Sequence, residues 1–177
     1  MSMESIYEYG SRAGVWRVLD LFRALSLPIT LFAVAMAMQR HPAVIERALA
    51  DGHEIASHGY RWINYHGMSC DQEAEHMARA IAIHTDICGA RPLGWYTGRT
   101  SQNTRDLVAE EGGFLYDADD YSDDLPFWST QVAKPHLIVP YTLDTNDMRF
   151  ATAQGFHNSN QFAQYLIDAF DVLYDEG

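Results

Sequence analysis

The chain has 177 residues, 47% of them hydrophobic, and a formal net charge of −12 at pH 7. The length suits a single domain over residues 1–177, and the hydrophobic fraction excludes an intrinsically disordered chain. The negative charge argues against nucleic acid and against an anionic membrane as partners. An acidic cytoplasmic enzyme is the expected class.

Targeting and redox signals agree with that expectation. Residues 1–5 lack a basic segment followed by an apolar run, so no secretory signal is predicted. The longest apolar stretch, residues 25–38, is broken by polar residues and a proline and is too short to span a bilayer. Cys70 and Cys88 fall in one predicted helix, roughly 27 Å apart at 1.5 Å per residue, beyond disulfide reach. We expect both to be reduced.

Helical and strand-like segments alternate along the chain. Apolar periodicity and helix start and stop residues predict helices over residues 11–25, 42–50, 69–88, 101–111 and from about 158 onward. Short apolar runs predict strands over residues 29–34, 52–58, 92–96, 114–116 and 137–140. This alternation predicts an α/β fold with a parallel sheet and about five βα units. A complete (β/α) barrel usually needs ~250 residues, so the alternatives are an open sheet or an incomplete barrel.

Residues 52–62 carry the strongest functional signal. The predicted strand ends at His58, and catalytic residues gather at the C-terminal ends of parallel strands. Glu54 and His58 share one face of the strand, whereas His53 points to the other face and is not expected to bind a metal together with His58. We predict His58 as a catalytic residue, with Glu54 as its orienting partner because a buried carboxylate needs one. The alternative is a hydrogen-bonded core histidine.

Residues 91–99 form a second cluster around a predicted strand. Arg91 and Arg99 offer paired donors to a carboxylate or ureido oxygen, and the glycines between them permit close backbone approach. This composition suits a site for a flat polar ligand, and a surface arginine beside a packed Trp95 is an equal alternative.

Two polar segments follow. The acidic run over residues 117–124 lacks the glycine and terminal glutamate of a calcium loop and is interpreted as a solvated charge run. Residues 144–150 come after a predicted strand, where polar side chains either line a ligand site or form a turn. No glycine-rich phosphate loop or nucleophile elbow is present.

The motifs at residues 52–58 (Gly-His-Glu-Ile-Ala-Ser-His) and 91–95 (Arg-Pro-Leu-Gly-Trp) resemble the polysaccharide deacetylase (NodB-homology) superfamily. This resemblance implies a distorted (β/α) barrel of about five βα units here. Metal-dependent members bind zinc or a similar cation through one aspartate and two histidines of a His-x-x-x-His motif. In this chain Trp62 stands four positions after His58, so the second histidine is absent. The aspartate pair of the family's first motif also has no match.

Residues 3–12, 91–99, 123–128 and 144–150 resemble the allantoinase branch of the superfamily. That branch opens the hydantoin ring of allantoin to allantoate and is regarded as not needing a metal. The resemblance implies a small cyclic ureide as substrate and no cofactor. It also implies that the chain is the middle part of a longer barrel.

In this interpretation water attacks a ring carbonyl, and a tuned side chain rather than a metal takes its proton. The expected catalytic residues are His58 and Glu54. The expected substrate-binding residues are Arg91, Trp62, Trp95, Tyr96, Arg99 and Asp147. One alternative is a metal-dependent N-deacetylase of acetylated sugars, in which His58 would ligate Zn²⁺. Another is an inactive fragment of such an enzyme, whose open sheet edges favour a homo-oligomer.

Overall fold

The computed structural model describes residues 3–132 and 134–177. The chain forms two compact units, Met1–Pro140 and Tyr141–Gly177. The first contains a sheet with its helices, and the second contains one long helix and the segment that leads to it. The single domain expected from the sequence stays a prediction.

The first unit is built on a six-stranded sheet with the order β1-β2-β3-β4-β6-β5. Its strands are β1 (Thr30–Ala33), β2 (Glu54–Ser57), β3 (Gly94–Trp95), β4 (Tyr116–Asp117), β5 (Phe127–Ser129) and β6 (His136–Ile138). All neighbours are parallel except β5, which runs antiparallel to β6. The predicted α/β fold with a parallel sheet is therefore confirmed. Because β1 and β5 are edges, the sheet is that of an incomplete barrel.

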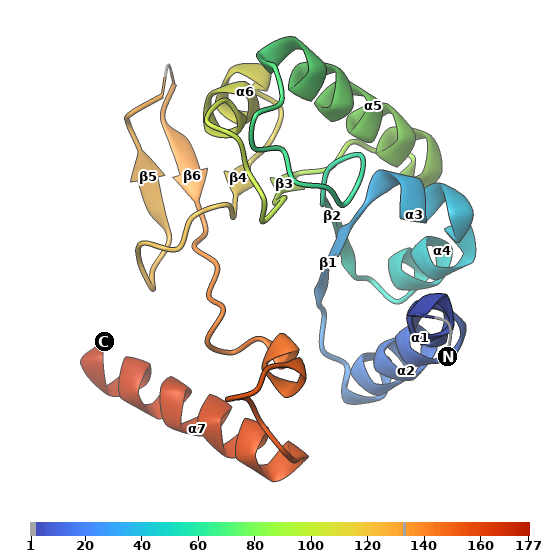
Figure 1. The fold of residues 1–177 in the computed structure, drawn as a ribbon, viewed down its shortest axis with the longest axis vertical. Helices are drawn as coiled ribbons and strands as arrows, with labels where there is room; N and C mark the ends of the chain where they lie inside the picture. The colour runs from blue at the N-terminus through green and yellow to red at the C-terminus, as the bar shows by residue number, and fades with distance from the viewer. Residues whose placement is uncertain (1–2, 133) are drawn as a thin grey trace. The chain divides into compact units, whose positions relative to one another are not determined.

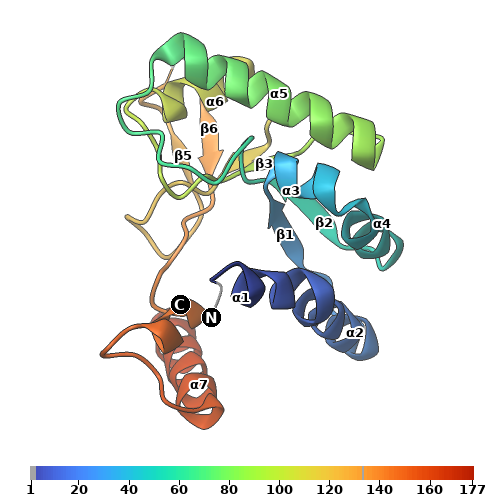
Figure 2. The same ribbon diagram turned by 45° about the vertical axis from the view of Figure 1, so that its right-hand side comes forward.

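The strands follow an arc, and helices lie on its outer side (Figures 1 and 2). The helices of this unit are α1 (Met3–Tyr9), the π-helix η1 (Gly10–Gly14), α2 (Val15–Leu25), α3 (Ala35–Arg40), α4 (Pro42–Ala50), α5 (Cys70–Cys88) and α6 (Thr104–Glu111). Among the described residues, no helix is both long enough and apolar enough to cross a membrane. Cys70 and Cys88, at the two ends of α5, are free as expected.

Most predicted elements are found, and the differences have local causes. The first helix was expected from residue 11 but is already helical at Met3, since the π-helical turn η1 joins α1 to α2 without a break. Helix α3 was not predicted because its apolar residues continue the apolar run of β1. Strand β5 was not predicted because it is short and follows the acidic run.

Two hydrophobic clusters hold the helices to the sheet. The first joins α2, α3 and α4 to β2 through the buried residues Leu19, Met38, Val44, Ile45, Ala48 and Ile55. The second lies under α5 and α6 and consists of Ala35, Met77, Ala80, Trp95, Val108 and Phe114. Burial of such side chains is the main stabilising contribution to the fold, at about 25 cal/mol per Å² of apolar surface.

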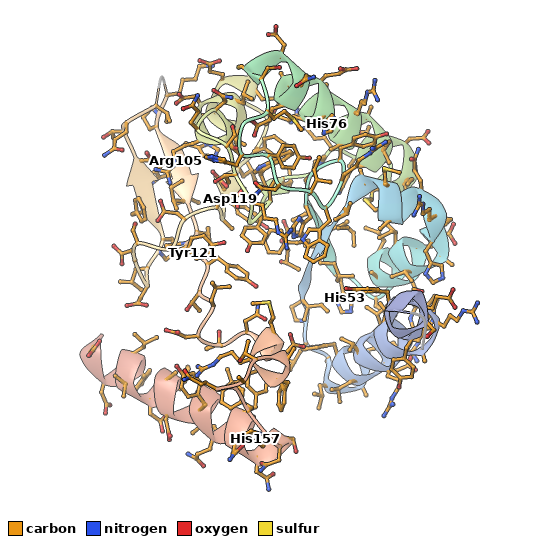
Figure 3. The ribbon with its side chains drawn as sticks, viewed as in Figure 1. His53, His76, Arg105, Asp119, Tyr121 and His157 are labelled. Atoms are coloured by element: carbon orange, nitrogen blue, oxygen red, sulfur yellow. The ribbon has the colours of Figure 1, made fainter. Side chains whose placement is uncertain are left out.

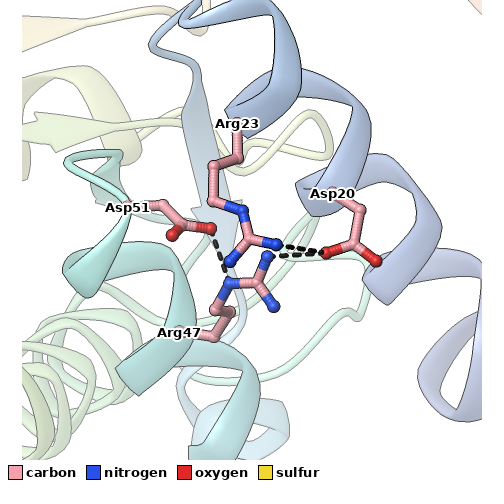
Figure 4. A network of polar contacts seen from close by, with 4 residues as sticks. All are labelled: Asp20, Arg23, Arg47 and Asp51. Atoms are coloured by element: carbon pink, nitrogen blue, oxygen red, sulfur yellow. Dashed lines mark hydrogen bonds and ion pairs between the residues drawn. The ribbon is translucent and has the colours of Figure 1, made fainter.

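A polar network crosses the surface between α2 and α4 (Figure 4). Arg47 of α4 lies 2.7 Å from an oxygen of Asp20 on α2 and 2.6 Å from an oxygen of Asp51. Arg23 reaches the same Asp20 oxygen at 3.4 Å. Since Asp20 and Arg23 are exposed, the network contributes little to stability and mainly sets the approach of the two helices.

The second unit contains the 3₁₀-helix η2 (Asp147–Ala151) and α7 (Ser159–Glu176). Asn158 caps α7 by accepting a hydrogen bond from the N–H of Gln161 at 3.0 Å, so the predicted start of this helix is confirmed. The unit is packed by a cluster of aromatic rings, Phe150, Phe156, Phe162 and Tyr165. Phe170 is 65% exposed, because this cluster packs only the N-terminal half of α7.

Candidate active site

His58 follows β2 directly and is partly buried at the C-terminal end of the parallel strands. Its backbone N–H donates to the carbonyl of Ala33 at 2.9 Å, which continues the pairing of β1 with β2. The next residue, Gly59, has φ +70°, and a Cβ there would lie 3.2 Å from the hydroxyl of Tyr65. Glycine thus lets the chain turn immediately after His58.

An aromatic side chain packs against the imidazole of His58. Its ring centroid lies 5.2 Å from that of Tyr96, in an edge-to-face arrangement, and Tyr96 is only 8% exposed. The Tyr96 ring also contacts Phe32 of β1 at 5.4 Å. Its hydroxyl lies 3.0 Å from the hydroxyl of Tyr121, a residue of the loop after β4 (Figure 3). Tyr96 therefore contacts the imidazole, and Phe32 and Tyr121 in turn hold Tyr96 in place.

Asp119 lies two residues beyond β4, in the loop next to the one that follows β3, and borders this site (Figure 3). Its carboxylate accepts hydrogen bonds from the Thr97 N–H at 2.8 Å, the Thr97 hydroxyl at 2.9 Å and the Gly98 N–H at 2.6 Å. Gly98 has φ +68°, and a Cβ there would lie 2.8 Å from the Tyr96 hydroxyl, so glycine is required at this turn. Burial raises the pKa of Asp119 above its ordinary value, while these hydrogen bonds oppose the change.

The electrostatic surroundings of His58 favour a neutral imidazole. Burial lowers the pKa of His58 below 6.5, and the positive charge of Arg99 acts in the same direction. The negative charge of Asp119 opposes this change by attracting the imidazolium form. Near pH 7 His58 is therefore an unprotonated base with a carboxylate close enough to stabilise its conjugate acid.

Trp62 and Arg99 form the outer wall of the site. The guanidinium carbon of Arg99 lies 4.5 Å from the centroid of the Trp62 ring. Tyr65 links their two loops, since its N–H donates to the carbonyl of Arg99 at 3.0 Å. Trp62 is 59% exposed, so much of its ring remains accessible although Arg99 lies over it.

The acidic run after β4 differs from the solvated charge run expected from the sequence. Asp117 is 1% exposed and Asp120 is 9% exposed, whereas Asp123 and Asp124 are exposed. Burial raises the pKa of Asp117 to about 7. A polar cavity of about 200 Å³ is lined by Thr100, Ser101, Arg105, Asp117 and Asp119. The first part of the run is therefore interior, because it begins in β4 and continues along the edge of the sheet where Thr97 and Gly98 lie.

Glu54, expected to orient His58, lies at the opposite end of β2. Its carboxylate accepts hydrogen bonds from the Thr30 hydroxyl at 2.6 Å and the Tyr116 hydroxyl at 3.1 Å. Four residues of extended strand correspond to about 13 Å. The spacing places both residues on one face of the strand, but the length of the strand separates the two side chains.

Arg91 and Trp95 lie where helix α6 packs against the sheet. Arg91 precedes β3, with Nη2 2.6 Å from Glu111, and its guanidinium lies 5.4 Å from the ring centroid of Phe114. Trp95 is 2% exposed, and its ring lies 5.2 Å from the same phenylalanine. This placement differs from the expected contact with a substrate, since both side chains are used in packing.

Asp147 belongs to the second unit, where it is exposed and begins η2. Its expected role in substrate binding stays a prediction. Of the residues selected from the sequence, His58, Trp62, Tyr96 and Arg99 lie together. Asp119 was missed, although it follows a predicted parallel strand in the same way as His58 does.

Comparison with known proteins agrees with this fold. Residues 2–114 match the sequence profile of the family described as "Polysaccharide deacetylase". The Schizosaccharomyces pombe protein named "Putative polysaccharide deacetylase" is 44% identical over 192 residues, which cover 99% of this chain and 60% of that protein. Two crystal structures, of Puue allantoinase and of a "probable Polysaccharide deacetylase" from Pseudomonas aeruginosa PAO1, each show 66% identity and a TM-score of 0.96. Both alignments cover 99% of this chain and 59% of the other.

An incomplete (β/α) barrel with polar side chains at the C-terminal edge of its strands defines the class of protein. The chain belongs to the polysaccharide deacetylase family. It spans about 60% of the length of these relatives. The resemblance detected in the sequence is therefore confirmed.

The residues of this chain do not fit the metal site that the family resemblance implies. His58 offers one imidazole, but Trp62 stands at the position of the second histidine. The Arg99 guanidinium lies over that tryptophan ring, and its positive charge opposes a cation at the same place.

Proposed function

We propose that this protein is a cyclic amidohydrolase that opens the hydantoin ring of allantoin to allantoate. The observation that carries the proposal is the Trp62–Arg99 pair beside His58, at the position where metal-dependent relatives have their second histidine. The 66% identity to Puue allantoinase supports it. The pair offers a flat ring face and a guanidinium, which suit a planar ureide with carbonyl oxygens.

The reaction adds one water molecule across the ring C–N bond. His58 takes a proton from the attacking water, because burial keeps its imidazole neutral near pH 7. The negative charge of Asp119 stabilises the imidazolium that forms. Arg99 donates hydrogen bonds to the carbonyl oxygen as negative charge develops on it. The proton then passes to the leaving ring nitrogen, and the carbonyl carbon becomes a carboxylate.

Allantoin hydrolysis by the purified chain, measured before and after exhaustive chelation, tests this proposal. We expect turnover that the chelator leaves unchanged and that added Zn²⁺ does not increase. A folded chain that does not hydrolyse allantoin would contradict the proposal, and this is the result expected of the inactive-fragment alternative. Activity that disappears on chelation and returns with Zn²⁺ would contradict the metal-free mechanism.

A metal-dependent N-deacetylase is the second candidate. It is favoured by the family match and by the name of the Pseudomonas aeruginosa relative. This activity would release acetate from N-acetylglucosamine oligomers and would require Zn²⁺. Acetate release assayed on the same preparation separates the two functions, and we expect none above background.

A further inference from the structure

The hydrogen bonds around Asp119 depend on a second carboxylate. Asp117 is the last residue of β4, and its Oδ1 accepts a hydrogen bond from the backbone N–H of Asp119 at 2.9 Å. This bond closes a turn that directs the Asp119 side chain toward the loop after β3. There Asp119 accepts its three hydrogen bonds from Thr97 and Gly98.

The same chain of contacts continues to the imidazole. Thr97 and Gly98 lie between Tyr96, whose ring meets His58 at 5.2 Å, and Arg99, which lies over Trp62. A displacement of the Asp119 backbone would release both ends of this loop at once. Asp117 is therefore linked indirectly, through Asp119 and this loop, to the surroundings of His58 and to Arg99.

We propose that Asp117 is a positioning residue, whose carboxylate holds the backbone of Asp119 so that Asp119 fixes the loop of Thr97–Gly98 beside His58. Asp117 lies almost completely buried, so the hydrogen bond is shielded from water. Its effect on turnover rests on the proposed function, whereas its effect on the loop does not.

Two substitutions of similar shape separate the hydrogen bond from the volume of the side chain. Asp117→Asn keeps an oxygen that can accept from Asp119, and Asp117→Leu removes it. A matched control is Asp123→Ala, because Asp123 makes the same type of bond, to the N–H of Leu125 at 3.1 Å, at an exposed position.

The first readouts are independent of catalysis and use NMR. In Asp117→Leu we expect amide hydrogen exchange of Thr97, Gly98 and Asp119 to become about 10-fold faster or more. We also expect the pKa of His58 to fall relative to its value in Asp117→Asn, because the Asp119 carboxylate moves away. Both variants lack the Asp117 charge, so the difference between their His58 pKa values reports the position of the Asp119 carboxylate.

The other charged groups near Asp117 are Asp119 and Asp120 in its loop and Arg105 on α6. On the neighbouring strand β6 the titratable residue is His136.

The second readout is turnover of allantoin. We expect kcat in Asp117→Leu to fall about 10-fold or more with little change in KM. The kcat values of Asp117→Asn and Asp123→Ala should stay close to that of the wild-type protein.

Unchanged amide exchange and unchanged His58 titration in Asp117→Leu would overturn the proposal. If Asp117→Leu and Asp117→Ala both fail to fold while Asp117→Asn folds, Asp117 is a folding determinant and the positioning role is rejected. Altered exchange in a protein without allantoin turnover would uphold the positioning and reject the proposed reaction.

Discussion

The guanidinium of Arg99 lies over the ring of Trp62, with its carbon 4.5 Å from the ring centroid. The two residues come from the loops after β2 and β3, and Tyr65 ties these loops together through the carbonyl of Arg99. A cation at this distance from an indole ring is held in a defined place while its N–H groups stay free to donate. In the proposed function, this pair takes the place of a metal ligand and supplies a donor for substrate oxygens.

Removal of the Arg99 guanidinium should weaken substrate recognition. We expect Arg99→Ala to lower kcat/KM for allantoin by about 10- to 100-fold, since a hydrogen bond to a charged group contributes about 1.5–3 kcal/mol. Steady-state kinetics measure the loss. Arg79→Ala is the control, because Arg79 lies on α5 with its guanidinium 5.7 Å from the ring centroid of Tyr60. Equal kinetics for the two variants would exclude the role of Arg99.

Loss of the His58 imidazole should affect the chemical step. We expect His58→Ala to lower kcat by about 10²–10⁴-fold, the usual contribution of a general base. Binding of allantoin, measured by calorimetry, should be largely retained. His66→Ala is the matched control at an exposed position in the following loop. Normal turnover in His58→Ala would remove this histidine from the mechanism.

The pH dependence of kcat/KM should report the same group. The pKa of His58 is lowered by burial, and the base form is the active one. Activity should therefore be full above this pKa and should fall as the pH drops through it, with a midpoint below pH 6.5. A pH profile measured over the range in which the protein stays folded checks this result. A midpoint above pH 7 would point to a different base.

Asp117 should make stability depend on pH. Its pKa is raised from 3.8 to about 7 by burial, so between these pH values the folded protein keeps a proton that the unfolded chain releases. The free energy of unfolding therefore decreases as the pH rises through this interval, by up to about 4 kcal/mol at about 1.4 kcal/mol per unit. Asp117→Asn lacks this titration. Its free energy of unfolding, relative to that of the wild type, should therefore increase as the pH rises from 5 to 8. Urea unfolding at both pH values measures the difference, and a constant difference would show that Asp117 does not titrate in this range.

The elements of the fold were accessible from the sequence because their signals are local. Helix α4 begins at Pro42 and α5 is capped by Ser69, and both features are visible in the amino-acid order alone. His58 was found in the same way, since a strand pattern ends there. Asp119, the charged neighbour of that histidine, was not predicted from the sequence. It stands in a run of acidic residues whose composition is typical of solvent-exposed loops.

The sequence by itself determined the alternation of strands and helices, the histidine at the end of β2 and the loss of the second histidine at Trp62. Only the tertiary structure decided which side chains meet. Glu54 shares a face with His58 but lies one strand length away, and Trp95 packs under a helix instead of lining the site. Asp119 reaches the site across β3. Periodicity specifies the face of an element, whereas contact also depends on the position along the strand and on the neighbouring strand, which long-range packing sets.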